Sequence, residues 1–230
     1  MNTPVLSGIK ACIFDAYGTL FDVSSVARAA KDALGPKWID FSHMWRMKQL
    51  QYAWMRSLTG NYADFWQVTG DALDYTMASM DFEDDELRDR LMGLYLEILA
   101  YKEVPDTLKQ LKQNGCKMII LSNATPKMLD SAIKFNQLGG YFSAVISAEE
   151  AKKYKPHPDF YQLGADRLGL PKEQICFITS NGWDAYSAKA FGFTTLWCNR
   201  FDQRPEHLPE SPDGVIENLS QLPACLYPKK

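Results

Sequence analysis

The stretch IKACIFDAYGTL, residues 9–20, decides the fold, because an apolar run ends in Asp15 and passes into a loop that contains Gly18. The run from Ile9 to Phe14 has the length and apolar character of a buried strand. Such a strand delivers the next side chain to the carboxyl edge of a sheet, where open α/β folds bind ligands. The Asp15 carboxylate is therefore a candidate nucleophile; its alternative role is to cap a helix or a turn.

Strands and helices alternate in the second half of the chain. A parallel sheet with helices on both faces follows, because parallel neighbours need a crossover connection. The predicted strands span residues 117–122, 144–147, 175–179 and 194–198, and the predicted helices span 105–113, 126–135, 159–168 and 184–191.

Between the first strand and this alternating part lies a block with helical spacing of apolar residues and no strand-length β-branched run. Its predicted helices cover residues 24–34, 41–58, 62–75 and 84–99, with Gly35-Pro36 ending the first and Gly60 following the second. The sequence thus predicts an α/β fold: a Rossmann-like core of residues 1–22 and 101–230, and an inserted all-helical cap of residues 23–100 over the carboxyl edge of the sheet.

Composition excludes several classes of protein. A net charge of −3 over 230 residues, without a basic stripe, argues against nucleic-acid binding. The five cysteines have no CxxC spacing and are expected to be reduced thiols of a cytoplasmic protein. We expect no signal peptide and no membrane span, since no long apolar run occurs. The three histidines lack metal-like spacing, and no Ser or Cys nucleophile elbow accompanies them.

Four loops at the predicted sheet edge carry the polar residues. In chain order they supply Asp15, the pair Ser122-Asn123, Lys155 between prolines, and the set from Thr179 to Asp184. Ser, Asn and Asp at a strand-to-helix junction are, taken singly, more often helix N-caps than catalytic residues. Together they place an acid, hydroxyl-amide pairs and a lysine at strand ends of one sheet.

These loops resemble those of the haloacid dehalogenase superfamily, and longer strings resemble its L-specific (type II) 2-haloacid dehalogenases. The resemblance covers nearly the whole chain, cap included. The strings that carry it are FDAYGTLFD (14–22), WRMKQLQY (45–52), RSL (56–58), KPHP (155–158) with Tyr161, SNGWD (180–184) and FGF (191–193).

The resemblance implies a metal-independent, two-step hydrolysis of short 2-haloacids. Asp15 attacks the halogen-bearing carbon and forms an ester, which water then hydrolyses. No metal or other cofactor is expected: Tyr17 stands where superfamily phosphatases carry a second Asp, and Ser180 and Asn181 stand near another of their metal-holding acids. A superfamily phosphatase and a non-catalytic binder of small carboxylates are the alternatives.

The resemblance also implies the catalytic roles. Thr19, Ser180 or Asn181 holds the Asp15 carboxylate or the hydrolytic water, and Lys155 keeps Asp15 ionised.

Three further residues have alternative roles. Asp184 orients Lys155 or polarises the water, unless it caps the following helix. Tyr161 positions Lys155 or the substrate carboxylate, unless it only packs in the core. Thr179 keeps a hydroxyl where the family more often has Ser, and its added methyl group restricts the side-chain rotamer.

Substrate binding is implied for a further set of residues. Ser122 and neighbouring backbone donors bind the substrate carboxylate. Arg46 and Asn123 receive the halide, beside the ring edges of Phe65 and Trp183. Tyr17, Leu50 and Tyr161 complete the predicted substrate-binding residues. The only partners implied are the small-molecule haloacid and a second copy of the chain, in a homodimer formed through the cap helices.

Overall fold

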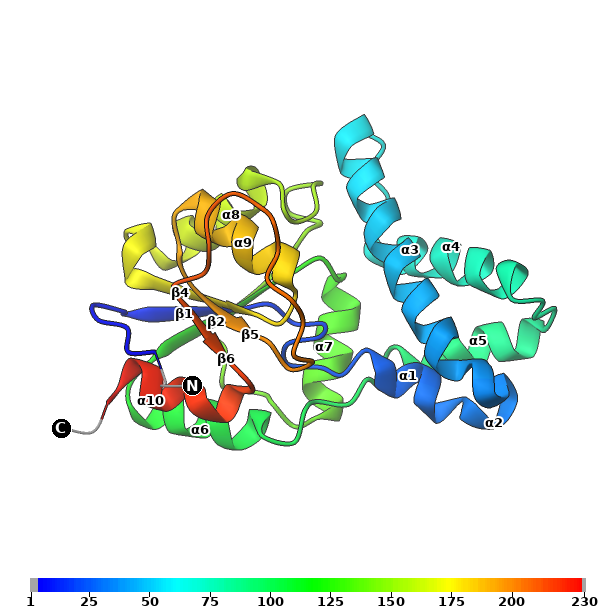
Figure 1. Cartoon of the computed structure of the whole chain (residues 1–230), viewed down its shortest axis with the longest axis horizontal. Helices are drawn as coiled ribbons and strands as arrows, with labels where there is room; N and C mark the ends of the chain where they lie inside the picture. Colours follow the sequence, from blue (N-terminus) through cyan, green and yellow to red (C-terminus); the bar gives the residue numbers. More distant parts are fainter. Residues whose placement is uncertain (1–3, 229–230) are drawn as a thin grey trace.

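Six parallel strands form one sheet in the computed structural model, which describes residues 4–228. The order across the sheet is β3-β2-β1-β4-β5-β6. Figure 1 shows α8 and α9 on one side of this sheet and α6 and α10 on the other. The predicted α/β class with helices on both faces is confirmed. The strands are β1 (Ala11–Phe14), β2 (Lys117–Ser122), β3 (Ala144–Ser147), β4 (Ile175–Thr179), β5 (Thr194–Cys198) and β6 (Gly214–Ile216).

The core helices alternate with the strands as predicted from residue 105 onward. The four strands predicted for the second half have the predicted bounds. The sequence reading missed β6 and α10, both of which are short. The helices of this part are α6 (Val104–Gln113), α7 (Pro126–Phe135), α8 (Pro158–Leu168), α9 (Gly182–Phe191) and α10 (Leu222–Leu226).

Five helices between β1 and α6 form a separate lobe, as Figure 1 shows in blue and cyan to green. The longest, α3, ends at Gly60, whose left-handed φ of 71° stops the helix. Asp64 and Asp84 cap α4 and α5 by accepting hydrogen bonds from Gln67 N and Leu87 N. The cap helices are α1 (Ser24–Ala29), α2 (Lys31–Leu34), α3 (Trp38–Thr59), α4 (Phe65–Ser79) and α5 (Asp85–Leu94).

Several predicted helix bounds differ from the structure in this lobe. The first predicted helix is broken at Ala30, which leaves the helical region with ψ of 20°. Helix α2 ends at Leu34 before Gly35-Pro36, as predicted, but Gly35–Lys37 forms a 3₁₀ turn, so that α3 begins at Trp38 and not at residue 41. Because Asp64 is the N-cap, α4 begins after it and runs to Ser79. Helix α5 ends at Leu94, and the chain then turns back toward the core.

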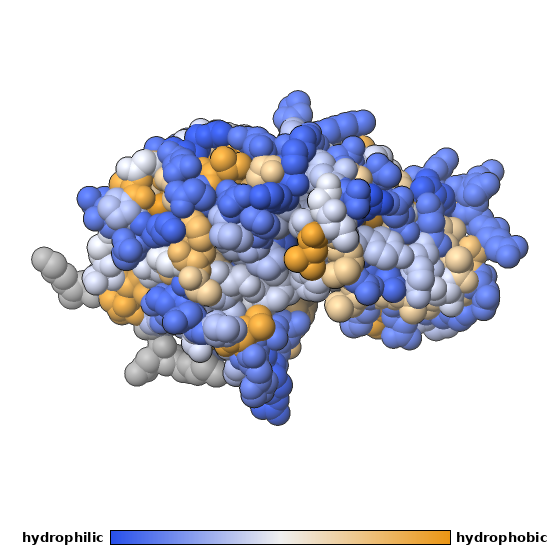
Figure 2. All heavy atoms as spheres, turned by 90° about the horizontal axis from the view of Figure 1, so that it is seen from above, coloured by the Kyte–Doolittle hydropathy of each residue, from blue (hydrophilic) through white to orange (hydrophobic). Residues whose placement is uncertain are grey.

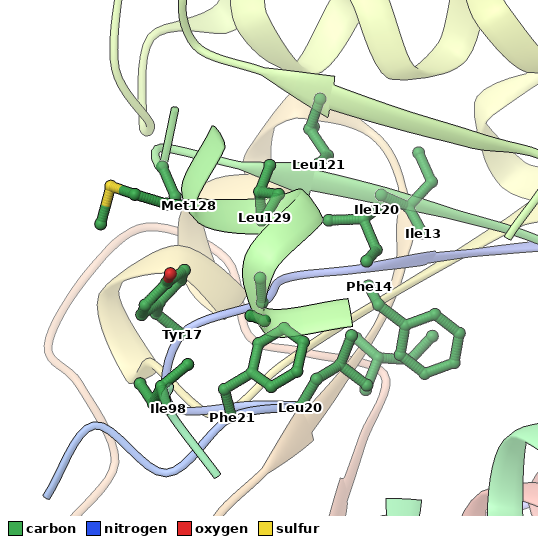
Figure 3. Close-up of a cluster of buried hydrophobic side chains, with 14 of the residues drawn as sticks. Ile13, Phe14, Tyr17, Leu20, Phe21, Ile98, Ile120, Leu121, Met128 and Leu129 are labelled. Carbon is green, nitrogen blue, oxygen red and sulfur yellow. The ribbon is translucent and has the colours of Figure 1, made fainter. Parts of the chain in front are cut away.

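Two adjacent chain segments join the lobe to the core. Asp22 N donates to Leu99 O at 2.7 Å, and Tyr101 N donates to Leu20 O at 3.0 Å. Figure 3 shows the apolar side chains beneath this junction, where Phe21 and Ile98 lie near Tyr17. The loop after β1 is therefore held on one side by the sheet and on the other by the chain returning from the cap.

Figure 2 shows one face of both lobes, which is largely hydrophilic with apolar side chains in small patches.

Candidate active site

Asp15 lies where the strand order reverses, at the carboxyl end of the central strand β1. Strand β1 pairs with β2 on one side and with β4 on the other, and Asp15 N donates to Ile178 O at 2.9 Å. This is the point at which parallel α/β sheets leave a crevice for a ligand. Gly18, with φ of 93°, turns the following loop back so that Thr19 faces the carboxylate.

The two oxygens of the Asp15 carboxylate have different partners. Oδ2 accepts hydrogen bonds from Thr19 Oγ1 at 2.8 Å, Asn181 Nδ2 at 2.8 Å and Thr179 Oγ1 at 3.3 Å. Oδ1 accepts from Lys155 Nζ at 2.6 Å. One oxygen is therefore surrounded by donors, while the other has a single charged partner among the described residues.

Lys155 is 1% exposed and lies between two carboxylates. Its Nζ is 2.6 Å from Asp15 Oδ1 and 2.7 Å from Asp184 Oδ2. Burial by itself would lower the pKa of Lys155, but the charges of Asp15 and Asp184 outweigh burial and raise that pKa. The ammonium therefore stays charged at neutral pH, and one buried cation faces two buried acids.

Asp184 does not cap α9, because the helix begins at Gly182 with Asn181 at its N-cap. Its Oδ1 accepts from Tyr161 OH at 2.6 Å. Burial raises the pKa of Asp184, and the hydrogen bonds from Lys155 and Tyr161 oppose that shift. Burial also raises the pKa of Tyr161, so its phenol is protonated and donates to Asp184. The capping alternative for Asp184 and the packing-only alternative for Tyr161 are thus not what the structure shows.

A second strand end faces Asp15 from β2. Ser122 is buried, and its Oγ accepts from Ala124 N at 3.2 Å, which leaves the hydroxyl proton for another acceptor. Asn123 Oδ1 accepts from Lys155 N at 2.9 Å, so the amide oxygen is bound to the backbone and the NH₂ group is the part left for a ligand.

These side chains enclose a cavity of about 10 Å³, at the lower limit for one water molecule. The cap contributes Arg46 and Phe65, and the core contributes the rest. A larger cavity of about 390 Å³ has Asp64 and Thr125 in its wall, the chain neighbours of Phe65 and Ala124. The residues that line the smaller cavity are Asp15, Tyr17, Arg46, Phe65, Ser122, Asn123, Ala124, Lys155, Asn181 and Trp183.

The structure thus brings together most of the residues predicted for the site, in two shells. Thr19, Thr179 and Asp184 do not line the cavity and contact Asp15 or Lys155. Tyr161 contacts Asp184, which in turn contacts Lys155. Ser180 contributes its backbone, since its N–H donates to Thr19 Oγ1 at 2.8 Å; within residues 4–228 its side chain makes no hydrogen bond to Asp15. Leu50 is buried in the cap and is not among the residues that line the cavity.

Two buried residues of the cap were missed by the sequence reading. Gln49 Oε1 accepts from Arg46 Nη1 at 2.6 Å, and Tyr95 stacks on Tyr17 with ring centroids 5.6 Å apart. The available signal was the spacing of three residues between Arg46 and Gln49, which puts both on one side of a helix.

The donors around Asp15 do not fit a magnesium ion. Both buried carboxylates are paired with Lys155, and a neutral phenol occupies the place two residues after Asp15, because burial raises the pKa of Tyr17. Mg²⁺ requires several oxygen ligands in octahedral geometry, and an ammonium group repels it. The chemistry of this site is therefore that of a carboxylate nucleophile among hydrogen-bond donors.

Comparisons with known proteins agree with this geometry. A family model for haloacid dehalogenase-like hydrolases matches residues 9–192. The chain is 40% identical to (S)-2-haloacid dehalogenase 4A of Burkholderia cepacia, over 95% of each chain. It is also 40% identical to haloacetate dehalogenase H-2 of Moraxella sp. (strain B), over 93% of this chain and 96% of that protein.

A solved structure adds a chemical detail. L-2-haloacid dehalogenase from Xanthobacter autotrophicus, with chloropropionic acid covalently bound, superimposes with a TM-score of 0.87 at 37% identity. The match covers 94% of this chain and 97% of that one. In that relative, the haloacid is attached to the protein.

Proposed function

The chain belongs to the haloacid dehalogenase-like hydrolase family, and on that premise we propose that it hydrolyses short-chain L-2-haloalkanoic acids to D-2-hydroxyalkanoic acids without a metal ion. The single observation that carries the proposal is the buried Asp15 carboxylate, which contacts Lys155 in a small cavity that Arg46 also lines. The Asp15 carboxylate can act as a nucleophile, and Arg46 has no carboxylate partner among the described residues. This pair of groups suits a reaction in which an anion leaves a carbon atom.

In the first step Asp15 Oδ1 attacks C2 of the haloacid. The new C–O bond forms as the C–X bond breaks, and the halide leaves with the bonding electrons, so the configuration at C2 inverts. Oδ1 is the nucleophile because Oδ2 already accepts from Thr19, Asn181 and Thr179. Arg46 and the Asn123 amide receive the halide, and the Ser122 hydroxyl with nearby backbone donors binds the substrate carboxylate.

In the second step water attacks the ester at Asp15 Cγ. Negative charge then develops on Oδ2, where the donors of Thr19, Asn181 and Thr179 are already in place and act as an oxyanion hole. Asp184 does not line the cavity, so the water proton reaches it through Lys155, whose Nζ contacts both Asp15 and Asp184. The intermediate then collapses: the Cγ–Oδ1 bond breaks, the C2–Oδ1 bond is retained, and the departing alkoxide takes that proton back. The Asp15 carboxyl group loses its remaining proton to solvent, so haloacid and water give hydroxyacid, halide and one proton.

The decisive experiment supplies purified protein with racemic 2-chloropropionate in EDTA, and measures chloride and the chirality of the lactate. We expect chloride release and D-lactate from the L substrate alone. In a single turnover with an excess of enzyme in H₂¹⁸O, the label should enter Asp15 rather than the lactate, because water attacks Cγ. Phosphate release that depends on Mg²⁺, without dehalogenation, would assign the phosphatase alternative; binding of 2-chloropropionate without turnover would assign the binder.

We also propose that the protein acts as a cytoplasmic homodimer with two bodies per chain, a core of residues 1–22 and 101–230 and a cap of residues 23–100. Five free, buried cysteines suit a reducing compartment. No helix within residues 4–228 is long and apolar enough to cross a membrane.

Exposed apolar side chains of the cap support self-association. Met47, Met55 and Leu58 are each about half exposed or more, and their spacing places them on one side of α3. Sedimentation velocity of wild type and of a variant with Met55→Glu and Leu58→Glu tests this: a dimer should become a monomer. A monomeric wild type would contradict the dimer alone and leave the dehalogenase proposal unaffected.

A further inference from the structure

The guanidinium of Arg46 contacts only neutral groups. Its Nη1 donates to Gln49 Oε1 at 2.6 Å, and its Nη2 donates to Tyr17 O at 3.4 Å. Within the part of the chain that the structure describes, no carboxylate lies within 4.0 Å of Arg46. The four other arginines of the cap are each paired with an aspartate: Arg28 with Asp22, Arg56 with Asp71, Arg88 with Asp74, and Arg90 with Asp32. Arg46 therefore presents an uncompensated positive charge to the cavity.

The amide of Gln49 is fully buried and its orientation is fixed. Its Nε2 donates to Thr69 Oγ1 at 2.8 Å and to Tyr95 OH at 3.0 Å. The Thr69 hydroxyl gives its own proton to Phe65 O at 2.6 Å, so its oxygen can only accept from Gln49. The nitrogen of Gln49 thus points to Thr69 and its oxygen points to Arg46.

This network reaches the cavity wall by a second route. Tyr95 stacks on Tyr17, with an interplanar angle of 15°, and Tyr17 lines the cavity. Trp45 Nε1 donates to Thr69 O at 2.9 Å and ties the same network to α3. Helices α3 and α4 and the segment after α5 therefore hold the Gln49 side chain together, and a buried polar network with every partner in place is rigid.

We propose that Gln49 is a positioning residue that aims Arg46 at the departing halide through a neutral acceptor, so that the full charge of the guanidinium remains for the anion. A glutamate at this position would accept the same hydrogen bond but would neutralise the guanidinium. The inference rests on the proposed function, because it assigns the halide as the anion that Arg46 receives.

Gln49→Glu tests the role of charge, and α3 supplies a matched control. Gln51 Oε1 accepts from Lys48 Nζ at 3.0 Å with the same three-residue spacing. Gln51 is exposed, however, and neither it nor Lys48 lines the cavity. We expect Gln49→Glu to lower kcat at least tenfold and to raise the inhibition constant of the product chloride at least tenfold. Gln51→Glu should leave both values within twofold of wild type.

Gln49→Met separates orientation from charge, because it keeps the volume, removes the hydrogen bond and leaves Arg46 charged. We expect a fivefold or larger fall in kcat and a smaller loss of chloride inhibition than with Gln49→Glu. Should the buried glutamate prevent folding, this variant carries the test by itself. Wild-type kcat and wild-type chloride inhibition in the folded Gln49 variants would overturn the inference.

Bromide binding to the resting protein gives a readout independent of turnover. At constant ionic strength, bromide should raise the melting temperature of wild type and of Gln51→Glu, and should raise that of Gln49→Glu much less. Equal stabilisation of all three proteins would overturn the positioning role while wild-type dehalogenation still stood. If bromide stabilised wild type more than Gln49→Glu, but wild type released no halide from any haloacid, the proposed function would fail and the positioning role would stand.

Discussion

On the core side of the cavity, Asp15 receives hydrogen bonds from Thr19, Thr179 and Asn181 and an ion pair from Lys155, all at strand ends of one sheet. On the cap side, Arg46 projects from one helix, and among residues 4–228 its one hydrogen bond to the core goes to Tyr17 O at 3.4 Å. The groups proposed for the covalent chemistry thus lie at the sheet edge, and the charge proposed to receive the halide comes from a separate lobe. We infer that changes in the core decide whether the reaction occurs, whereas changes in the cap set its rate and its halide dependence.

The largest effect is expected for Asp15→Asn. The amide has nearly the same shape but is not a nucleophile, so halide release should fall by at least ~10⁴-fold. Lys155 keeps Asp184 as a partner, so the fold should persist, which circular dichroism and a melting curve would show. Chloride release at the wild-type rate by this variant would falsify the proposed mechanism.

Arg46→Ala tests the cap side of the cavity. Removing the charge proposed to receive the halide should lower kcat by roughly 10²-fold, within the range measured for single electrostatic groups in active sites. Arg56→Ala is the control, because Arg56 lies on the same helix and pairs with Asp71 at 2.7 Å on the surface. A loss as large in the control would mean that the cap acts through its stability rather than through Arg46.

Tyr161→Phe tests the hydrogen bond that Tyr161 OH donates to Asp184 on the core side. The Tyr161 hydrogen bond lowers the pKa of Asp184, so its removal should raise that pKa further. Asp184 must be ionised to pair with Lys155, and the acid limb of the kcat profile should therefore move to higher pH. The plateau of kcat should fall by less than about tenfold, because no reacting atom is touched. An unchanged acid limb would assign that limb to another group.

The sequence predicted the core side better than the cap side for a physical reason. Strand ends of a parallel sheet converge on one edge, so Asp15, Ser122, Lys155 and Asp184 could be placed together before any coordinates. Helix faces carry no such rule. Leu50 is buried and does not line the cavity, so its contact with substrate stays a prediction, and its neighbour Gln49 was missed.

The bounds of secondary structure differ in the same way. The strands from β2 to β5 have their predicted bounds because each is a short apolar run between turn signals. In the cap, the break at Ala30 and the entry into α3 through Gly35-Pro36 depend on how helices pack, which residue preferences alone do not specify. Strand β6 has only three residues, too few for a periodic signal.

The smallest effect is expected for Thr179→Ser, which asks whether the donors on Asp15 are equivalent. Thr179 Oγ1 is 3.3 Å from Oδ2, the longest of the three hydrogen bonds, and it also accepts from Asn181 N at 3.1 Å. Serine keeps the hydroxyl and loses one buried methyl group, which costs about 1 kcal/mol of folding free energy and loosens χ1. We expect kcat within about threefold of wild type, because Thr19 and Asn181 still hold Oδ2.

Thr179→Val keeps the shape of the side chain and removes the hydrogen-bond donor, so it should slow ester hydrolysis more than Thr179→Ser does. The aspartyl ester should then accumulate and be visible by intact-protein mass spectrometry. Equal rates for the two variants would show that the methyl group packs while the hydroxyl contributes nothing, and would reduce the oxyanion hole to Thr19 and Asn181.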